Sequence, residues 1–127
     1  MKELIKRAIE ASERAYAPYS GYKVGAAILT ESNKIYEGAN IENASYSPTV
    51  CAERVAIFKA VFDNEREFKA LAVYGQNMAY PCGVCRQVLS EFCTPQLKIY
   101  IVKDENNFEE TTLGGLLPKS FTKNNLG

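Results

Sequence analysis

The chain has 127 residues, of which 46% are hydrophobic and 24% charged, and its 15 basic side chains balance 15 acidic ones. Chains of this length usually form one domain, so we expect a single domain over residues 1–127. The zero net charge argues against a nucleic-acid-binding protein that depends on an overall basic field. Apolar runs fall well short of the ~20 residues that span a bilayer, so we expect no membrane partner.

The first part of the chain predicts a helix followed by a β-hairpin. Apolar residues lie on one stripe over residues 3–16, which indicates an amphipathic helix, and Pro18 is expected to end it. Residues 22–30 and 34–40 have the composition of strands and are separated by a short polar turn.

The second part alternates helices with strands. In chain order we expect a helix at 51–62, a buried strand at 70–76, a helix from about 83 to 92, a strand at 97–103, a weaker strand near 108–112 and a last short helix within TTLGGLLP. In the helix at 51–62, the side chains expected to face mostly inward are Val55, Ala56, Phe58, Lys59, Val61 and Phe62. A hairpin followed by this alternation implies an α/β sandwich with a mixed sheet.

The sequence contains four cysteines and no histidine. Without an imidazole, Ser-His-Asp and Cys-His nucleophile systems and HExxH proteases are excluded. Four cysteines are few for an extracellular disulfide scaffold, and the charged N-terminus lacks the apolar run of a signal peptide. We therefore expect a cytoplasmic protein whose reduced thiols are available for a metal or for catalysis.

Cys82 and Cys85 form a CxxC motif, which is typical of either a redox pair or half of a metal site. The spacing alone does not decide between them. A redox pair normally follows the first strand of a thioredoxin-like pattern, whereas this motif lies late in the chain. A third cysteine, Cys51, begins the other internal helix. This arrangement favours a metal site over a redox pair.

Cys93 is the remaining thiol, and it is expected on the same helix as Cys85. Eight residues of helix separate the two by roughly 12 Å, while a Zn–S bond is about 2.3 Å long. Cys93 therefore cannot bind the same ion and is expected to be a small buried residue. Three thiolates leave one tetrahedral position of zinc open, as in catalytic sites.

Charged residues adjoin the cysteines. Glu53 could exchange protons with water on the metal if the ion lies beyond the helix end, or it could simply stabilise the helix dipole, and spacing favours neither. Arg54 is expected to offset the negative charge of three thiolates. For Arg86, the sequence does not decide between that role and a solvated surface position.

Several motifs together resemble the zinc-dependent cytidine deaminases, and most closely their small homotetrameric class. They are CAER (51–54), PCGVCRQ (81–87), AYAPYS (15–20), VGAA (24–27), NIENASY (40–46) and LLP near the end of the sequence. The resemblance implies a three-layer α/β/α sandwich with a mixed sheet of about five strands. It also implies hydrolytic deamination of cytidine and 2'-deoxycytidine in pyrimidine salvage, with release of ammonia.

The resemblance further assigns site residues. Cys51, Cys82 and Cys85 would hold one zinc ion per chain, Glu53 would carry protons, and the backbone at Ala52 would contact the base.

Other positions match the family's nucleoside contacts. Asn40 and Glu42 match a pair that binds the ribose hydroxyls, and Tyr22 replaces a phenylalanine that commonly stacks on the pyrimidine. The positions that would complete a neighbouring subunit's pocket are Ala44, Tyr46 and Phe121. On the residues alone, Asn40 and Glu42 could equally serve a turn, and the aromatic residues could be part of the core.

Three alternatives remain open at this point. One is a related deaminase of the same fold, of the blasticidin S type or acting on a polynucleotide, although the neutral charge argues against the latter. The others are a zinc-stabilised binding module with a closed four-ligand site and a redox CxxC protein.

Overall fold

A five-stranded sheet forms the centre of the protein, and its elements follow the alternation expected from the sequence. The structure is a computed structural model and describes residues 1–122. Its elements are α1 (Lys2–Ser12), β1 (Gly25–Thr30), β2 (Ile35–Ala39), α2 (Ala52–Phe62), β3 (Phe68–Tyr74), α3 (Gly83–Phe92), β4 (Lys98–Asp104), β5 (Asn107–Thr112) and α4 (Leu113–Leu116). The strand order is β2-β1-β3-β4-β5. Only β3 and β4 pair in parallel among these strands, so the predicted mixed sheet is confirmed.

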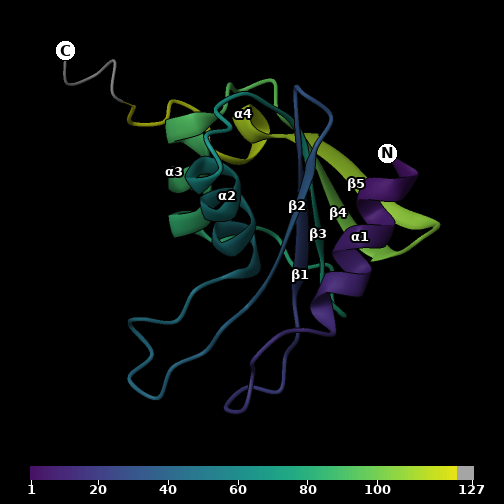
Figure 1. Cartoon of the computed structure of the whole chain (residues 1–127), viewed down its shortest axis with the longest axis vertical. Coiled ribbons are helices and arrows are strands. Elements are labelled where there is room, and N and C mark those ends of the chain that lie inside the picture. Colours follow the sequence, from purple (N-terminus) through teal and green to yellow (C-terminus); the bar gives the residue numbers. More distant parts are fainter. Residues whose placement is uncertain (123–127) are drawn as a thin grey trace.

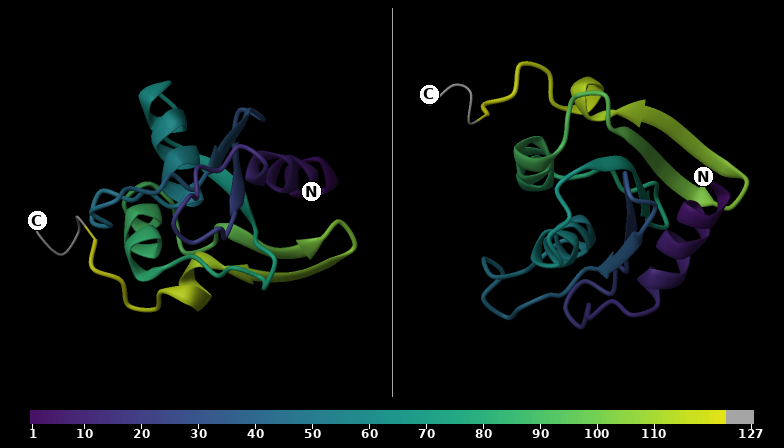
Figure 2. Two further views of the ribbon diagram at one scale, coloured as in Figure 1. Left: turned by 90° about the horizontal axis from the view of Figure 1, so that it is seen from below. Right: turned by 45° about the horizontal axis from the view of Figure 1, so that its top comes forward.

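The helices cover the sheet from two sides. Helix α1 lies on one face, while α2 and α3 lie side by side on the other, which gives three layers (Figures 1 and 2). A buried apolar cluster joins the sheet to α2 and α3, and a second cluster joins it to α1. The predicted three-layer α/β/α architecture is therefore confirmed.

The first helix and the first strand are both shorter than predicted. Helix α1 ends at Ser12 rather than at residue 16, because the backbone N–H of Tyr16 donates instead to the carbonyl of Asn40, at 2.9 Å. Strand β1 begins at Gly25 rather than at residue 22. The side-chain amide of Asn40 bonds the N–H of Val24 and the carbonyl of Tyr22, so this segment is held by a side chain and not by the sheet. The other elements lie within two residues of the predicted positions.

The predicted inward face of α2 is wrong for its largest side chains. Phe58 and Phe62 are 46% and 91% exposed, and Lys59 is exposed as well. Three alanines, one isoleucine and one carboxylate are buried instead: Ala52, Ala56, Ala60, Ile57 and Glu53. The cause is Gly38 on β2, where an added Cβ would lie 2.4 Å from the Ala52 carbonyl oxygen. The helix backbone therefore contacts the strand too closely for large side chains to fit between them.

The longest helices within residues 1–122 are α1 and α2, with 11 residues each. None of the described helices has the length and apolar character needed to cross a membrane.

Candidate active site

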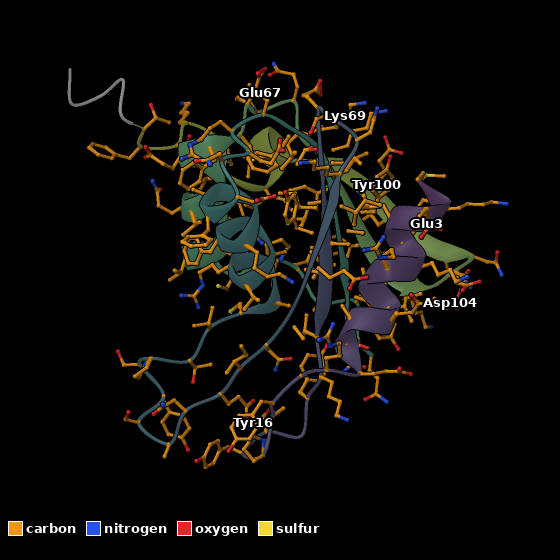
Figure 3. All side chains as sticks on the ribbon, in the orientation of Figure 1. Glu3, Tyr16, Glu67, Lys69, Tyr100 and Asp104 are labelled. Carbon is orange, nitrogen blue, oxygen red and sulfur yellow. The ribbon has the colours of Figure 1, made fainter. Side chains whose placement is uncertain are left out.

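Two irregular segments, 13–24 and 40–50, lie together at one end of the sheet (Figure 1). The backbone of Tyr16 joins them, since its N–H donates to Asn40 and its carbonyl accepts from Glu42, both at 2.9 Å. Figure 3 shows Tyr16 among these segments, far from Glu67 at the other end of the molecule. The second segment leads directly into Cys51 and α2. The course of segment 40–50 therefore determines where α2 begins.

Three cysteine thiols converge where α2 and α3 begin. Cys51 is the N-cap of α2, Cys82 is the N-cap of α3, and Cys85 lies in the first turn of α3. The Sγ atoms of Cys51 and Cys82 are 3.7 Å apart, those of Cys82 and Cys85 are 3.4 Å apart, and all three lie within 4.8 Å of one another. Tetrahedral zinc with bonds of about 2.3 Å separates its sulfur ligands by about 3.8 Å. These thiols therefore fit a zinc ion.

The surroundings of Cys51 favour its thiolate form. The pKa of Cys51 is lowered to about 5, first by a hydrogen bond from the Cys85 thiol and, among smaller causes, by the Arg54 guanidinium. The pKa of Cys85 is raised for the same reason, because Cys85 keeps its proton while Cys51 is charged. One Arg54 Nη atom lies 3.5 Å from the Cys51 sulfur and 3.3 Å from the Thr49 carbonyl. Arg54 thus places a cation beside the metal-ligand candidates.

Glu53 lies on the first turn of α2 and is only 4% exposed. Burial raises the pKa of its carboxyl to about 7. The backbone N–H of Glu53 lowers the pKa to a lesser extent, and the smaller effects of the Cys51 charge, which raises it, and of Arg54, which lowers it, oppose each other. A carboxyl with a pKa near neutrality can both accept and release a proton at physiological pH. Glu53 is therefore a buried carboxyl beside the thiols whose pKa permits proton exchange near neutral pH.

A cavity of about 230 Å³ opens in front of these groups. Six of the predicted site residues line it, namely Tyr22, Asn40, Cys51, Ala52, Glu53 and Cys82. The sequence missed five further lining residues, which are Val24, Thr49, Val50, Ala79 and Tyr80. Each is within two residues of a predicted site residue or of Pro81, and that proximity is the only signal that could have found them. The third thiol, Cys85, is fully buried behind the cavity.

The two residues predicted to bind ribose lie differently. Asn40 lines the cavity, and its side chain also accepts from Val24 N–H and donates to the Tyr22 carbonyl, each at 2.9 Å. Glu42 does not line the cavity. Its carboxylate accepts hydrogen bonds from the Ser20 hydroxyl and from the N–H groups of Tyr19 and Ser20, and the Ser20 hydroxyl is the main cause that lowers its pKa. Both residues therefore serve the local turns, and only Asn40 reaches the cavity in a single chain.

The positions predicted to complete a neighbouring pocket are exposed and lie outside this cavity. Tyr46 and Phe121 are 74% and 59% exposed, and Ala44 is also exposed. Their placement leaves them available to a second copy of the chain.

Arg86 and Cys93 lie apart from the converging sulfurs. Arg86 donates to the carbonyls of Pro81, at 2.7 Å, and Leu116, at 2.8 Å, so it ties α3 to its flanking segments. Cys93 follows the last turn of α3 and packs against the main core, where burial raises the pKa of its thiol to about 12.

Comparison with known proteins identifies relatives over nearly the whole chain. Residues 1–101 match the family model described as the cytidine and deoxycytidylate deaminase zinc-binding region. The cytidine deaminase of Sporosarcina psychrophila is 49% identical over 128 aligned residues, which cover 99% of this chain and 94% of that protein. The cytidine deaminase of Halalkalibacterium halodurans is 47% identical, covering 94% of this chain and 92% of the relative.

A solved structure agrees with the sequence relatives. The crystal structure of cytidine deaminase from Burkholderia pseudomallei superposes with a TM-score of 0.90 at 45% identity, covering 94% of this chain and 97% of that one. The fold, the zinc-binding region and the sequence relatives all agree, and the chain belongs to the cytidine and deoxycytidylate deaminase family.

Proposed function

We propose that residues 1–127 form a single-domain zinc hydrolase that converts cytidine and 2'-deoxycytidine into uridine and 2'-deoxyuridine with release of ammonia. The observation that carries this proposal is the buried Glu53 carboxyl beside three converging thiols, two of which line the same cavity as Glu53. The names of the relatives supply the substrate class.

Cys51, Cys82 and Cys85 would hold the zinc ion as thiolates. When bound there, zinc supplies the Lewis acidity that makes water a nucleophile at neutral pH. Glu53 would accept the proton that water loses as its oxygen bonds to C4 of the cytosine ring. The same carboxyl would give that proton to N3, then take the second proton as the new C4 hydroxyl becomes a carbonyl and pass it to the departing amino group, so water and cytidine give uridine and ammonia.

The remaining cavity residues would hold the nucleoside. Asn40 is within the cavity and would bond a ribose hydroxyl, the Tyr22 ring would lie against the pyrimidine, and the backbone at Ala52 would contact the base. Glu42 would assist at the sugar, and its negative charge would disfavour a nucleotide phosphate there.

A homotetramer would complete this site. Ala44, Tyr46 and Phe121 are exposed in the single chain and match the positions expected to contribute to a neighbouring pocket. We place the enzyme in the cytoplasm, where it would serve pyrimidine salvage with no nucleic-acid or membrane partner.

The test of the proton-transfer role is Glu53→Gln. The amide keeps the shape of the side chain but cannot take up the proton, so we expect kcat for cytidine to fall by roughly 10²–10⁴-fold with one zinc still bound. Glu67→Gln is the matched control, since Glu67 is exposed at the other end of the molecule (Figure 3). Wild-type turnover by Glu53→Gln with zinc bound would remove Glu53 from the mechanism.

A substrate panel separates the proposed function from its alternatives. Ammonia release is measured with cytidine, 2'-deoxycytidine, cytosine and a short cytosine-rich single strand. Turnover of the two nucleosides above the free base and the strand supports the proposal. Turnover of none, by zinc-loaded protein, would instead indicate a zinc-stabilised binding module.

A further inference from the structure

The loop between β3 and α3, residues 75–81, forms one wall of the cavity. Ala79 and Tyr80 line the cavity, and Cys82 follows directly. A local turn shapes the loop, in which Met78 N–H donates to the Gly75 carbonyl at 3.1 Å and Met78 has φ +55°. A displacement of this loop would therefore move both a cavity wall and a metal-ligand candidate.

The hydroxyl of Tyr22 contacts this loop from across the cavity. It accepts a hydrogen bond from the backbone N–H of Asn77 at 3.4 Å. It also occupies the space over Gly75, where an added Cβ would lie 2.6 Å from the Tyr22 oxygen and 2.8 Å from the Ala79 Cβ. The loop therefore packs against the hydroxyl. A residue with a Cβ at position 75 would collide with the Tyr22 oxygen, so the contact requires glycine there.

The backbone of Tyr22 is bonded to the residues proposed to bind the sugar. Its N–H donates to the Ser20 hydroxyl at 3.0 Å, and that hydroxyl donates to Glu42. Its carbonyl accepts from the Asn40 side chain at 2.9 Å. Tyr22 is therefore the residue through which hydrogen bonds run from Glu42 and Asn40 to the 75–81 loop.

We propose that Tyr22 is a positioning residue, whose hydroxyl holds the 75–81 loop against the nucleoside and links the sugar-binding segment to this wall of the cavity. This inference rests on the proposed function and goes beyond ring stacking, which a phenylalanine could provide. The hydroxyl fixes the cavity wall formed by Ala79 and Tyr80, so its effect belongs to nucleoside binding and not to proton transfer.

The contact itself is tested by amide hydrogen exchange in Tyr22→Phe. Removing the acceptor should make the Asn77 amide exchange about two- to tenfold faster, the range expected for one net hydrogen bond. Tyr74→Phe is the control, because Tyr74 directly precedes Gly75 but packs on the α1 side of the sheet. In Tyr74→Phe, the Asn77 amide should exchange at the same rate as in the wild type.

Coupling to the substrate is tested by kinetics with cytidine. Tyr22→Phe should raise KM about two- to tenfold, leave kcat within about twofold and keep one zinc per chain. Gly75→Ala should raise KM more, and combining it with Tyr22→Phe should make the Gly75→Ala effect smaller, because the added methyl no longer meets an oxygen.

The outcomes separate this inference from the proposed function. Unchanged Asn77 exchange, unchanged KM in Tyr22→Phe, or strictly multiplicative effects in the double variant would each overturn the positioning role. A wild-type chain that is inactive on cytidine would instead overturn the proposed function, while the exchange measurement would still test the contact.

Discussion

The four cysteines differ in what surrounds each sulfur. Cys51 and Cys82 stand at the first residues of two helices, where free N–H groups favour thiolate, and the N–H of Cys85 lies 3.4 Å from the Cys82 sulfur. Cys93 stands at the opposite end of α3 among apolar side chains, which raise the pKa of its thiol to about 12. The first kind of environment suits a metal ligand, and the second suits a small core residue.

Zinc content therefore distinguishes Cys93 from the other thiols. Cys93→Ala should retain one zinc per chain and lose about 1 kcal/mol of stability, because only a small packed side chain is removed. Cys82→Ala should retain less than half of the zinc, since two thiolates cannot hold the ion as tightly as three. Metal analysis after gel filtration gives the zinc content of each variant. Loss of zinc from Cys93→Ala would contradict the three-thiolate site.

At this scale, helix geometry made part of the site predictable from the sequence. The 1.5 Å rise per residue separates Cys93 from Cys85, and the structure places them at opposite ends of α3. The contacts of Tyr22, Tyr80 and Arg86 could not be predicted, because each reaches a residue 29 or more positions away in the chain. No periodicity indicates, for example, that the Tyr80 hydroxyl donates to Glu109 of β5, at 2.6 Å.

At the scale of elements, the position of helix α2 is determined by its close packing against strand β2. An added Cβ at Gly38 would lie 2.4 Å from the Ala52 carbonyl oxygen and 2.5 Å from the Ala56 nitrogen, both backbone atoms that cannot rotate away. Cys51, Ala52 and Glu53 belong to the same first turn. Any displacement of α2 from β2 therefore also moves the proposed proton carrier.

Gly38→Ala tests this packing. The methyl group must displace α2, so we expect a loss of about 1–3 kcal/mol of stability and a drop in deaminase activity. Gly83→Ala is the control for stability, because an added Cβ there meets nothing within 4 Å and lies in the first turn of α3. Urea denaturation of both zinc-loaded variants gives the comparison. Equal stability of Gly38→Ala and the wild type would contradict the close packing.

The order and type of the elements could be predicted, whereas the inward face of α2 could not. Helix α3 occupies Gly83–Phe92 as predicted, and β5 confirms the weaker strand near 108–112. The error on α2 arose because aromatic residues were expected to face the core. A glycine on another element, Gly38, decides which side chains fit beneath the helix, and the sequence of the helix itself does not contain that information.

At the scale of the whole molecule, aromatic side chains remain exposed on α2 and on the segments outside the helices and strands. Tyr46, Phe58, Phe62, Tyr80 and Phe121 are each between 46% and 91% exposed. Aromatic side chains are enriched at interfaces between protein subunits. They are consistent with the proposed homotetramer, in which α2 would contribute Phe58 and Phe62.

Phe62→Ser tests that assembly. Losing a large apolar contact should weaken association at least about tenfold and lower activity at low protein concentration. Sedimentation velocity over a concentration series measures the first effect, and Lys103→Ser on the exposed end of β4 is the control. A wild-type chain that sediments as a monomer, or Phe62→Ser that stays tetrameric at every concentration, would contradict this role.

The meeting of α2 and α3 at their first residues also has a consequence for the order of folding. Cys51 and Cys82 are 31 positions apart in the chain, and α2 and β3 lie between them. Their sulfurs reach each other only after both helices have docked on the same face of the sheet, which requires the non-local pairing of β3. We therefore expect the three-thiolate site to exist only in the folded framework. Metal loading of this enzyme should accordingly become complete after the sheet and its helices have docked.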